Sequence, residues 1–148
     1  MSTFDPPQGY SSLSPYLIVD DPDALRDFIL TVFPAASLKA HYRKPGGETH
    51  SIEIAFGDCL MMIGGSQPGF GPFQTMQHVY VSDVDAAYQR ALDLGAQPVM
   101  PPGEQFYGDY AAGVLGPHNN FWWMARNLEL LDEAAVNQRL AERESGRD

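Results

Sequence analysis

Residues 16–24 read Tyr-Leu-Ile-Val-Asp-Asp-Pro-Asp-Ala, and residues 78–86 read His-Val-Tyr-Val-Ser-Asp-Val-Asp-Ala. When the two stretches are aligned, a valine, two aspartates and an alanine coincide. Each copy predicts a short apolar strand, an acidic turn and an amphipathic helix, and each half ends in a hydrophobic run, Leu60–Ile63 or Phe121–Met124. A repeat present only twice does not suit a solenoid, which needs further units to bury its core. It predicts two similar half-sheets with a ligand-binding trough between them.

The composition is that of a globular domain with few cations. The chain has 148 residues, of which 44% are hydrophobic, and a formal net charge of -10 at pH 7. Only nine lysine and arginine residues are present, so nucleic acid is not expected as a partner, because its binding depends on neutralised phosphates. The acidic surface indicates solubility and could also attract cationic small molecules.

The sequence favours a cytoplasmic location. Cys59 is the only cysteine, so no disulfide framework is expected and a reducing compartment is favoured. The N-terminus lacks the basic and apolar segments of a signal peptide. No apolar run is long enough to span a bilayer, so no membrane partner is expected.

Proline, glycine and apolar periodicity divide the chain into segments. Residues 1–13 predict a loose N-terminal arm and residues 14–145 a single domain. Within that domain we expect a first module over 14–64, a linker over 65–75, a second module over 76–127 and a C-terminal helix over 132–143. Strands are expected over 14–19, 38–42, 49–56, 59–63, 76–81, 97–100, 110–115 and 121–126, with helices over 23–32 and 83–94. Residues 101–107 are expected to form a loop.

Four segments carry a resemblance to a known family: residues 14–20, 53–58, 78–86 and, most distinctively, 100–109, Met-Pro-Pro-Gly-Glu-Gln-Phe-Tyr-Gly-Asp. Over residues 11–145 the chain resembles the vicinal oxygen chelate superfamily (glyoxalase I, bleomycin-resistance proteins and extradiol dioxygenases), and its PhnB-like branch in particular. The resemblance implies an α+β fold in which two βαβββ modules form a curved mixed sheet, followed by a C-terminal helix. It also implies a homodimer, with halves of the trough exchanged or apposed between subunits.

Two positions depart from the PhnB-like pattern. Tyr110 stands where that branch usually has arginine after the Gly-Asp pair, so no anion contact is carried over from it. The last turn reads Gly-Pro-His-Asn where the branch has Asp-Pro-x-Gly. Asn119 can adopt the left-handed conformation that glycine would supply, so the turn is expected to survive.

The resemblance also indicates where a metal would bind. In metal-dependent members each half supplies one ligand from its first strand and one, usually glutamate, from its last. Those positions fall on Ser14, Met62, Met76 and Trp123, and none of them suits a hard or borderline cation. A register shift of two residues brings in a single imidazole, His78. We therefore expect no metal ligand and no cofactor.

The remaining histidines do not complete a metal site. His41 is expected on the second strand and His118 in a turn, and both are interpreted as surface or rim residues. His50 precedes Glu53 by three positions on one strand, so their side chains are expected on opposite faces.

Most of the side chains expected to line the trough are aromatic or carry a thioether. Alternation along the strands turns Leu17 and Val19 toward the helices. The same alternation places on the concave side the residues Ser14, Tyr16, Ile18, Met62, Met76, His78, Tyr80 and Trp123. This lining is typical of a site that holds an apolar or planar ligand by stacking and dispersion, the alternative being that the same residues fill the core.

The segment after residue 104 adds further candidate ligand contacts, which are Gln105, Phe106, Tyr107 and Tyr110. Asp109 could orient a donor on the ligand or pin the loop by accepting backbone N–H bonds. His78 is the first candidate for proton transfer, because an imidazole titrates near neutral pH, and a structural histidine is the alternative. Glu53 would be a general base if it were buried without a partner, whereas a solvent-facing glutamate is the simpler expectation.

Three functions remain in competition. The first is a metal-free small-molecule-binding protein that holds an aromatic or cationic ligand. The second is a metal-independent isomerase, epimerase or lyase that uses His78 with Glu53 or Asp109 as acid and base. The third is a metal-dependent lyase or dioxygenase with a rearranged site, which would need converging ligands that the sequence does not offer.

Overall fold

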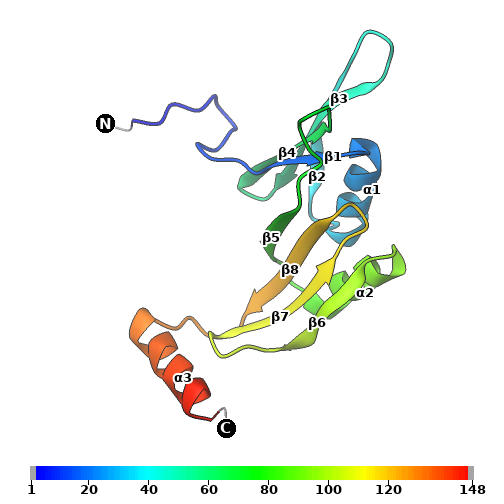
Figure 1. Cartoon of the computed structure of the whole chain (residues 1–148). Helices are drawn as coiled ribbons and strands as arrows, with labels where there is room; N and C mark the ends of the chain where they lie inside the picture. The colour runs from blue at the N-terminus through cyan, green and yellow to red at the C-terminus, as the bar shows by residue number, and fades with distance from the viewer. Residues whose placement is uncertain (1–2, 147–148) are drawn as a thin grey trace. The chain divides into compact units, whose positions relative to one another are not determined.

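The computed structural model describes residues 3–146, which form two compact units (Figure 1). The first unit holds the chain up to Thr75 together with residues 118–120, and the second holds the rest from Met76 onward. Met1 and Ser2, the start of the predicted arm, lie outside the described residues. Each unit is described by itself.

The first unit is a four-stranded sheet with one helix. Its elements are β1 (Tyr16–Val19), α1 (Pro22–Val32), β2 (Ser37–Arg43), β3 (Thr49–Phe56) and β4 (Cys59–Gly65). The strands lie in the order β1-β4-β3-β2, with β1 parallel to β4 and the other pairs antiparallel. Strand β1 is therefore an edge strand, and β4 separates it from β3.

The second unit repeats this arrangement and adds a helix. Its elements are β5 (Thr75–Tyr80), α2 (Val84–Asp93), β6 (Gln97–Glu104), β7 (Asp109–Leu115), β8 (Asn120–Asn127) and α3 (Glu133–Ser145). The strand order β5-β8-β7-β6 is the order of the first sheet with each strand replaced by its counterpart. The repeated βαβββ modules and the closing helix that the sequence predicts are therefore confirmed.

The aspartates of the repeat cap the two helices. The Asp21 carboxylate accepts a hydrogen bond from the Ala24 N–H at 3.1 Å, and the Asp83 carboxylate accepts one from the Ala86 N–H at 3.0 Å. Each bond satisfies a backbone donor that has no partner inside its helix. Pro22 opens α1, where its missing N–H costs nothing.

Each core lies between a sheet and its helix. In the first unit the buried stripe of α1 packs over β1, β3 and β4, which contribute Leu17, Ile52, Ile54 and Ile63. In the second unit α2 packs over β6 and β7 and buries two alanines, Ala87 and Ala91. The fully buried Trp122 belongs to the second core, where small helix residues leave room for large sheet residues.

Two segments differ from the sequence-based expectation. The predicted loop over 101–107 is strand as far as Glu104, because β6 is an edge strand and an edge tolerates Pro101 and Pro102, which lack N–H groups. The predicted linker over 65–75 is shorter, since β4 continues to Gly65 and β5 begins at Thr75.

The last turn adopts the expected conformation. Asn119 adopts φ 67°, which is the left-handed conformation predicted for it, and its side chain accepts a hydrogen bond from Gln74 at 2.7 Å. Among residues 3–146, none of the helices combines the length and the apolar character that a membrane crossing requires.

Candidate functional site

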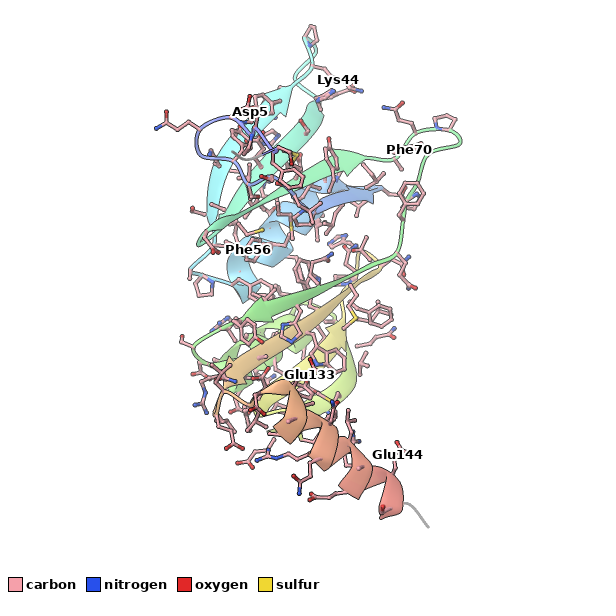
Figure 2. All side chains as sticks on the ribbon, turned by 90° about the vertical axis from the view of Figure 1, so that its left-hand side faces the viewer. Asp5, Lys44, Phe56, Phe70, Glu133 and Glu144 are labelled. Atoms are coloured by element: carbon pink, nitrogen blue, oxygen red, sulfur yellow. The ribbon has the colours of Figure 1, made fainter. Side chains whose placement is uncertain are left out.

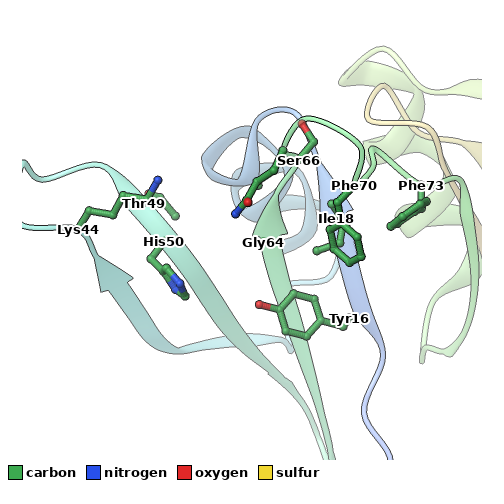
Figure 3. A pocket seen from close by; sticks show the side chains of 11 residues that line it. Tyr16, Ile18, Lys44, Thr49, His50, Gly64, Ser66, Phe70 and Phe73 are labelled. Atoms are coloured by element: carbon green, nitrogen blue, oxygen red, sulfur yellow. The ribbon is translucent and has the colours of Figure 1, made fainter.

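A hollow of about 380 Å³ lies on the face of the first sheet opposite α1 (Figure 3). This volume falls within the range of small-molecule sites. Three aromatic rings line the hollow, those of Tyr16, Phe70 and Phe73. Polar residues also line it, namely Lys44, Thr49, His50, Ser66 and Gln67.

The segment between β4 and β5 forms one wall of this hollow. It folds back along β1, because the Phe73 N–H donates to the Ile18 carbonyl at 3.1 Å and the Ser66 N–H donates to the Val19 carbonyl at 2.8 Å. The Phe70 and Phe73 rings meet edge to face with centroids 5.1 Å apart. The sequence predicts only a linker here, whereas the structure gives an ordered aromatic wall.

Glycine leaves the floor of the hollow open. Gly64 pairs with Ile18 on one side and with Ser51 on the other, so it lies in the middle of the lining. A Cβ atom at Gly64 would lie 3.0 Å from Tyr16 Cε1 and 3.2 Å from Ile18 Cδ1, which is tighter than ordinary contact. The space above the sheet therefore exists because this position has no side chain.

His50 enters the hollow through a β-bulge. Tyr42 pairs with Ser51 and Arg43 with Thr49, so His50 is the unpaired extra residue of β3. The Thr49 hydroxyl points to the helix side and donates to Asp23 at 2.6 Å. The prediction that His50 and Glu53 lie on opposite faces is wrong. The bulge turns His50 to the face of the sheet that carries Tyr16. Glu53 lies on the same face, because Met62 pairs with both Tyr16 and Glu53.

Glu53 is a buried carboxylate with a partner. Its side chain is only 7% exposed, and it accepts a hydrogen bond from the Tyr10 hydroxyl at 2.8 Å. Lys39 lies over the Tyr10 ring at 4.5 Å and donates to the Gly9 carbonyl at 3.1 Å. Two expectations are therefore corrected. Glu53 does not face solvent, and the later part of the arm is packed on the first sheet rather than loose (Figure 2).

We expect Tyr10 to titrate late. The hydrogen bonds to Glu53 and Tyr42 raise the pKa of Tyr10 from 10.0 to about 12. Since the folded pKa lies above the unfolded one, this contribution to stability is complete below pH 10.0 and is lost as the pH rises through about 12. In a phenolate absorbance titration, Tyr10→Phe should remove one late transition, and Glu53→Gln should move it back toward the ordinary tyrosine range. A titration that Glu53→Gln leaves unchanged would show that the contact does not persist in solution.

In the second unit, alternate side chains of β5 are exposed, and their predicted place in a trough stays a prediction. Met76 is 58% and Tyr80 66% exposed, and His78 between them is exposed as well, with its ring 5.0 Å from that of Tyr80. Trp123 lies flat over Gly113 of β7, where a Cβ atom would collide with the indole ring. These residues are the counterparts of those around Tyr16 and Met62.

Asp109 is buried and held by side chains. It is 3% exposed, and it accepts hydrogen bonds from the Asn127 amide at 2.8 Å and from the Tyr80 hydroxyl at 3.4 Å. The pKa of Tyr80 is raised, because its hydroxyl is partly buried and lies near the charge of Asp109. Asp109 thus links the start of β7 to β8 and β5. Its partners are side chains, whereas the sequence predicts backbone N–H groups or a ligand.

The segment from Gln105 to Tyr110 contacts the protein itself. Arg139 donates to the Phe106 carbonyl at 3.1 Å, and the Arg143 guanidinium lies 4.3 Å from the centre of the Phe106 ring. The Gln105 amide donates to the Gly103 carbonyl at 3.2 Å, and the Tyr107 ring packs edge to face on Phe106. Tyr110, which replaces the arginine of the PhnB-like pattern, donates to Asp85 at 2.9 Å. A ligand role for these residues stays a prediction.

No family model matches the chain, but individual relatives do. The chain is 30% identical over 145 residues to the uncharacterized protein Mb0911c of Mycobacterium bovis, and the alignment covers 86% of this chain and 93% of that protein. The chain belongs to the family of Mb0911c. The chain is also 30% identical over 145 residues to the uncharacterized protein Rv0887c of Mycobacterium tuberculosis. That alignment covers 86% of this chain and 84% of Rv0887c.

Several solved structures share the fold of this chain. TioX from Micromonospora sp. ML1 superposes with a TM-score of 0.65 at 24% identity, over 78% of this chain and 98% of TioX. A glyoxalase/bleomycin resistance protein/dioxygenase family enzyme from Burkholderia phytofirmans PsJN gives 0.62 at 19% identity, over 76% and 95%. The bleomycin resistance determinant encoded on transposon Tn5 gives 0.55 at 17% identity, over 78% and 96%. The glyoxalase/bleomycin-resistance fold is confirmed.

The residues at the expected metal positions do not fit a divalent cation. Ser14 offers a hydroxyl that shares a hydrogen bond with Ser11 at 3.2 Å, Met62 and Met76 offer thioethers, and Trp123 offers an indole ring over Gly113. Hard and borderline cations require carboxylate or imidazole ligands. Within residues 3–146, no three His, Cys, Asp or Glu side chains gather closely enough to hold a metal ion. We assign no metal-assisted step to this member of the Mb0911c family.

Sequence reasoning misses several residues of the hollow. Phe70 and Phe73 are hidden in a segment rich in glycine and proline, although two phenylalanines in a linker are themselves an unusual signal. His50 is missed because a bulge depends on cross-strand register, which local alternation does not reveal. Of the residues predicted on the concave side, Tyr16 and Ile18 line this hollow.

Proposed function

We propose that the protein binds an aromatic small molecule in the hollow of the first unit and holds it without chemical change. One observation carries this proposal: three aromatic residues that line the hollow remain about half exposed, at 49% for Tyr16, 55% for Phe70 and 46% for Phe73. A planar ligand between them would bury this apolar surface and add ring–ring contacts.

A relative by fold supports a small-molecule ligand. A bleomycin-binding protein, solved in complex with bleomycin, superposes with a TM-score of 0.52 at 18% identity over 78% of this chain. That ligand belongs to that protein. For this chain we infer the general role, small-molecule binding, and take the ligand class from the chain's own lining.

A second candidate function rests on the second unit. The Tyr80 ring contacts His78 and its hydroxyl reaches Asp109, so two of the predicted acid–base residues share a neighbour. This arrangement favours proton transfer as the alternative, in a metal-independent isomerase, epimerase or lyase. Turnover of a ligand that His78→Ala abolishes, with binding intact, would support this alternative over simple binding.

Binding should depend on the phenylalanine wall. We expect compounds with fused aromatic rings to bind saturably in calorimetry, and Phe70→Ser and Phe73→Ser each to weaken binding by about tenfold through lost stacking and apolar contact. Tyr80→Ser removes a more exposed ring, from the second unit, and should leave the affinity unchanged. Loss of binding in Tyr80→Ser, with both phenylalanine variants unaffected, would refute the assignment to the first unit.

The finer expectations belong to the same proposal. We propose membership of the PhnB-like branch, because the segment at residues 100–109 carries its most distinctive motif. A homodimer is proposed from the resemblance, and a cytoplasmic location from the single cysteine.

A further inference from the structure

We propose that the ligand of the first unit is a planar aromatic anion, such as an aryl carboxylate, whose acidic group contacts Lys44 and His50. This inference rests on the proposed function and names the ligand class. It starts from the charges around the hollow. Among the described residues that line it, none is aspartate or glutamate, whereas Lys44 and His50 are both present. In a chain with 19 acidic and nine basic residues, a lining that contains a lysine and no carboxylate runs against the overall composition.

Lys44 stands at the rim on a closed turn. The Lys44 N–H donates to the Glu48 carbonyl at 2.7 Å, and the Gly47 N–H donates to the Lys44 carbonyl at 2.8 Å, so the backbone of the turn is fixed. The ion pairs found within residues 3–146 involve Arg26, His41 and Arg139. The Lys44 ammonium is in none of them, so its charge is available to a ligand.

His50 presents a second donor. Its Nδ1 lies 3.0 Å from the Ser51 hydroxyl, which can donate to that nitrogen. In this tautomer Nε2 carries the proton and is the nitrogen left for a ligand. Figure 3 shows the His50 imidazole and the Tyr16 hydroxyl directed toward the same space, so a carboxylate there would meet more than one donor.

The two kinds of lining lie on opposite sides of the hollow. Lys44 and His50 come from the start of β3 and its turn, whereas Tyr16 lies on β1 and the phenylalanine wall lies beside it (Figure 3). Strand β4, with Gly64, separates the two sides. A ligand that spans the floor would therefore place its ring against the aromatic wall and its charged group against Lys44 and His50.

A cationic ligand is less well served by the same face. Two carboxylates lie near the hollow without lining it: Glu53, whose partner is the Tyr10 hydroxyl, and Asp20, which accepts a hydrogen bond from the Ser66 hydroxyl at 2.6 Å. A cation would have to displace Tyr10 to reach Glu53, and in the hollow as it stands it would meet Lys44. Like charges at close range disfavour such a complex.

Matched probes test this inference. The ligands 2-naphthoate, 2-naphthamide and 2-naphthylmethylamine share one ring system and differ in charge at neutral pH. We expect calorimetry to give a dissociation constant for the naphthoate about tenfold below that of the amide, with the amine weakest. Added salt should reduce the difference in affinity between the naphthoate and the amide, because salt screens partly exposed charges.

Two variants separate a direct contact from the general charge. Lys44→Gln should weaken naphthoate binding about fivefold, because a partly exposed ion pair contributes only a modest binding free energy. The affinity for the amide should not change. Arg43→Gln removes the same charge one residue away, where the side chain donates to the Gly47 carbonyl and does not line the hollow, and should change neither affinity. If the amide or the amine binds as tightly as the naphthoate, the inference is overturned and the proposed function stands. If none of the three probes binds saturably, both are overturned.

Discussion

Replacing Trp122 with alanine should lower the free energy of unfolding by about 3–5 kcal/mol, the cost of deleting a buried aromatic side chain. Trp122 is fully buried in β8, where it pairs with the equally buried Val114 of β7. The neighbouring sheet and α2 cannot close the space that the indole leaves, because they are already packed around it. Urea denaturation followed by circular dichroism measures the change without relying on tryptophan fluorescence.

The next residue is the matched control. Trp123 points to the opposite face of β8 and lies over Gly113, only partly buried. Trp123→Ala should therefore cost about 1–2 kcal/mol, since less apolar surface is lost from the fold. Equal losses in the two variants would show that the two faces of β8 have been assigned wrongly.

Gly64→Val should reduce affinity for an aromatic ligand by about 100-fold or more, while the protein remains folded. A Cβ atom at this position would already lie 3.0 Å from Tyr16 Cε1 and 3.2 Å from Ile18 Cδ1, so a valine fills the floor of the hollow. Tyr16 is half exposed at a sheet edge and can swing outward, and valine suits a strand. Calorimetry with 2-naphthoate gives the affinity, and thermal unfolding reports the fold.

Gly65→Val serves as the control for Gly64→Val. Gly65 also lines the hollow through its backbone, but a Cβ atom there would meet only Pro22 Cγ, at 3.8 Å, which is an ordinary contact on the side of α1. The same substitution one residue further along β4 should therefore leave the affinity within a fewfold of the unchanged protein. Retained binding in Gly64→Val would place the ligand elsewhere.

The fold was predictable because its signals are local. The stripe Leu25, Phe28, Ile29 and Val32 repeats with the period of a helix and is buried in α1. Asp21 and Asp83 precede their helices at the capping position, and the repeat itself predicts that both halves use one topology. The extension of β6 through Pro101 and Pro102 was not predictable, because proline is acceptable only once the strand is known to lie at an edge.

The site was less predictable because its geometry is set by distant contacts. Glu53 is buried by Tyr10, which lies 43 positions away in the sequence, and no local pattern announces that pairing. His50 reaches the hollow through a register irregularity in β2 and β3. Tyr16 was predicted correctly on the face away from the helix, since strand alternation alone decides it, and its contact with a ligand stays a prediction.

The most direct test is a crystal structure of the protein with bound 2-naphthoate. We predict electron density for the ring between Tyr16 and the Phe70–Phe73 pair, with the carboxylate directed toward Lys44 and His50. A naphthoate ring on the exposed face of β5, beside Met76 and Tyr80, with none in the hollow of the first unit, would contradict the account.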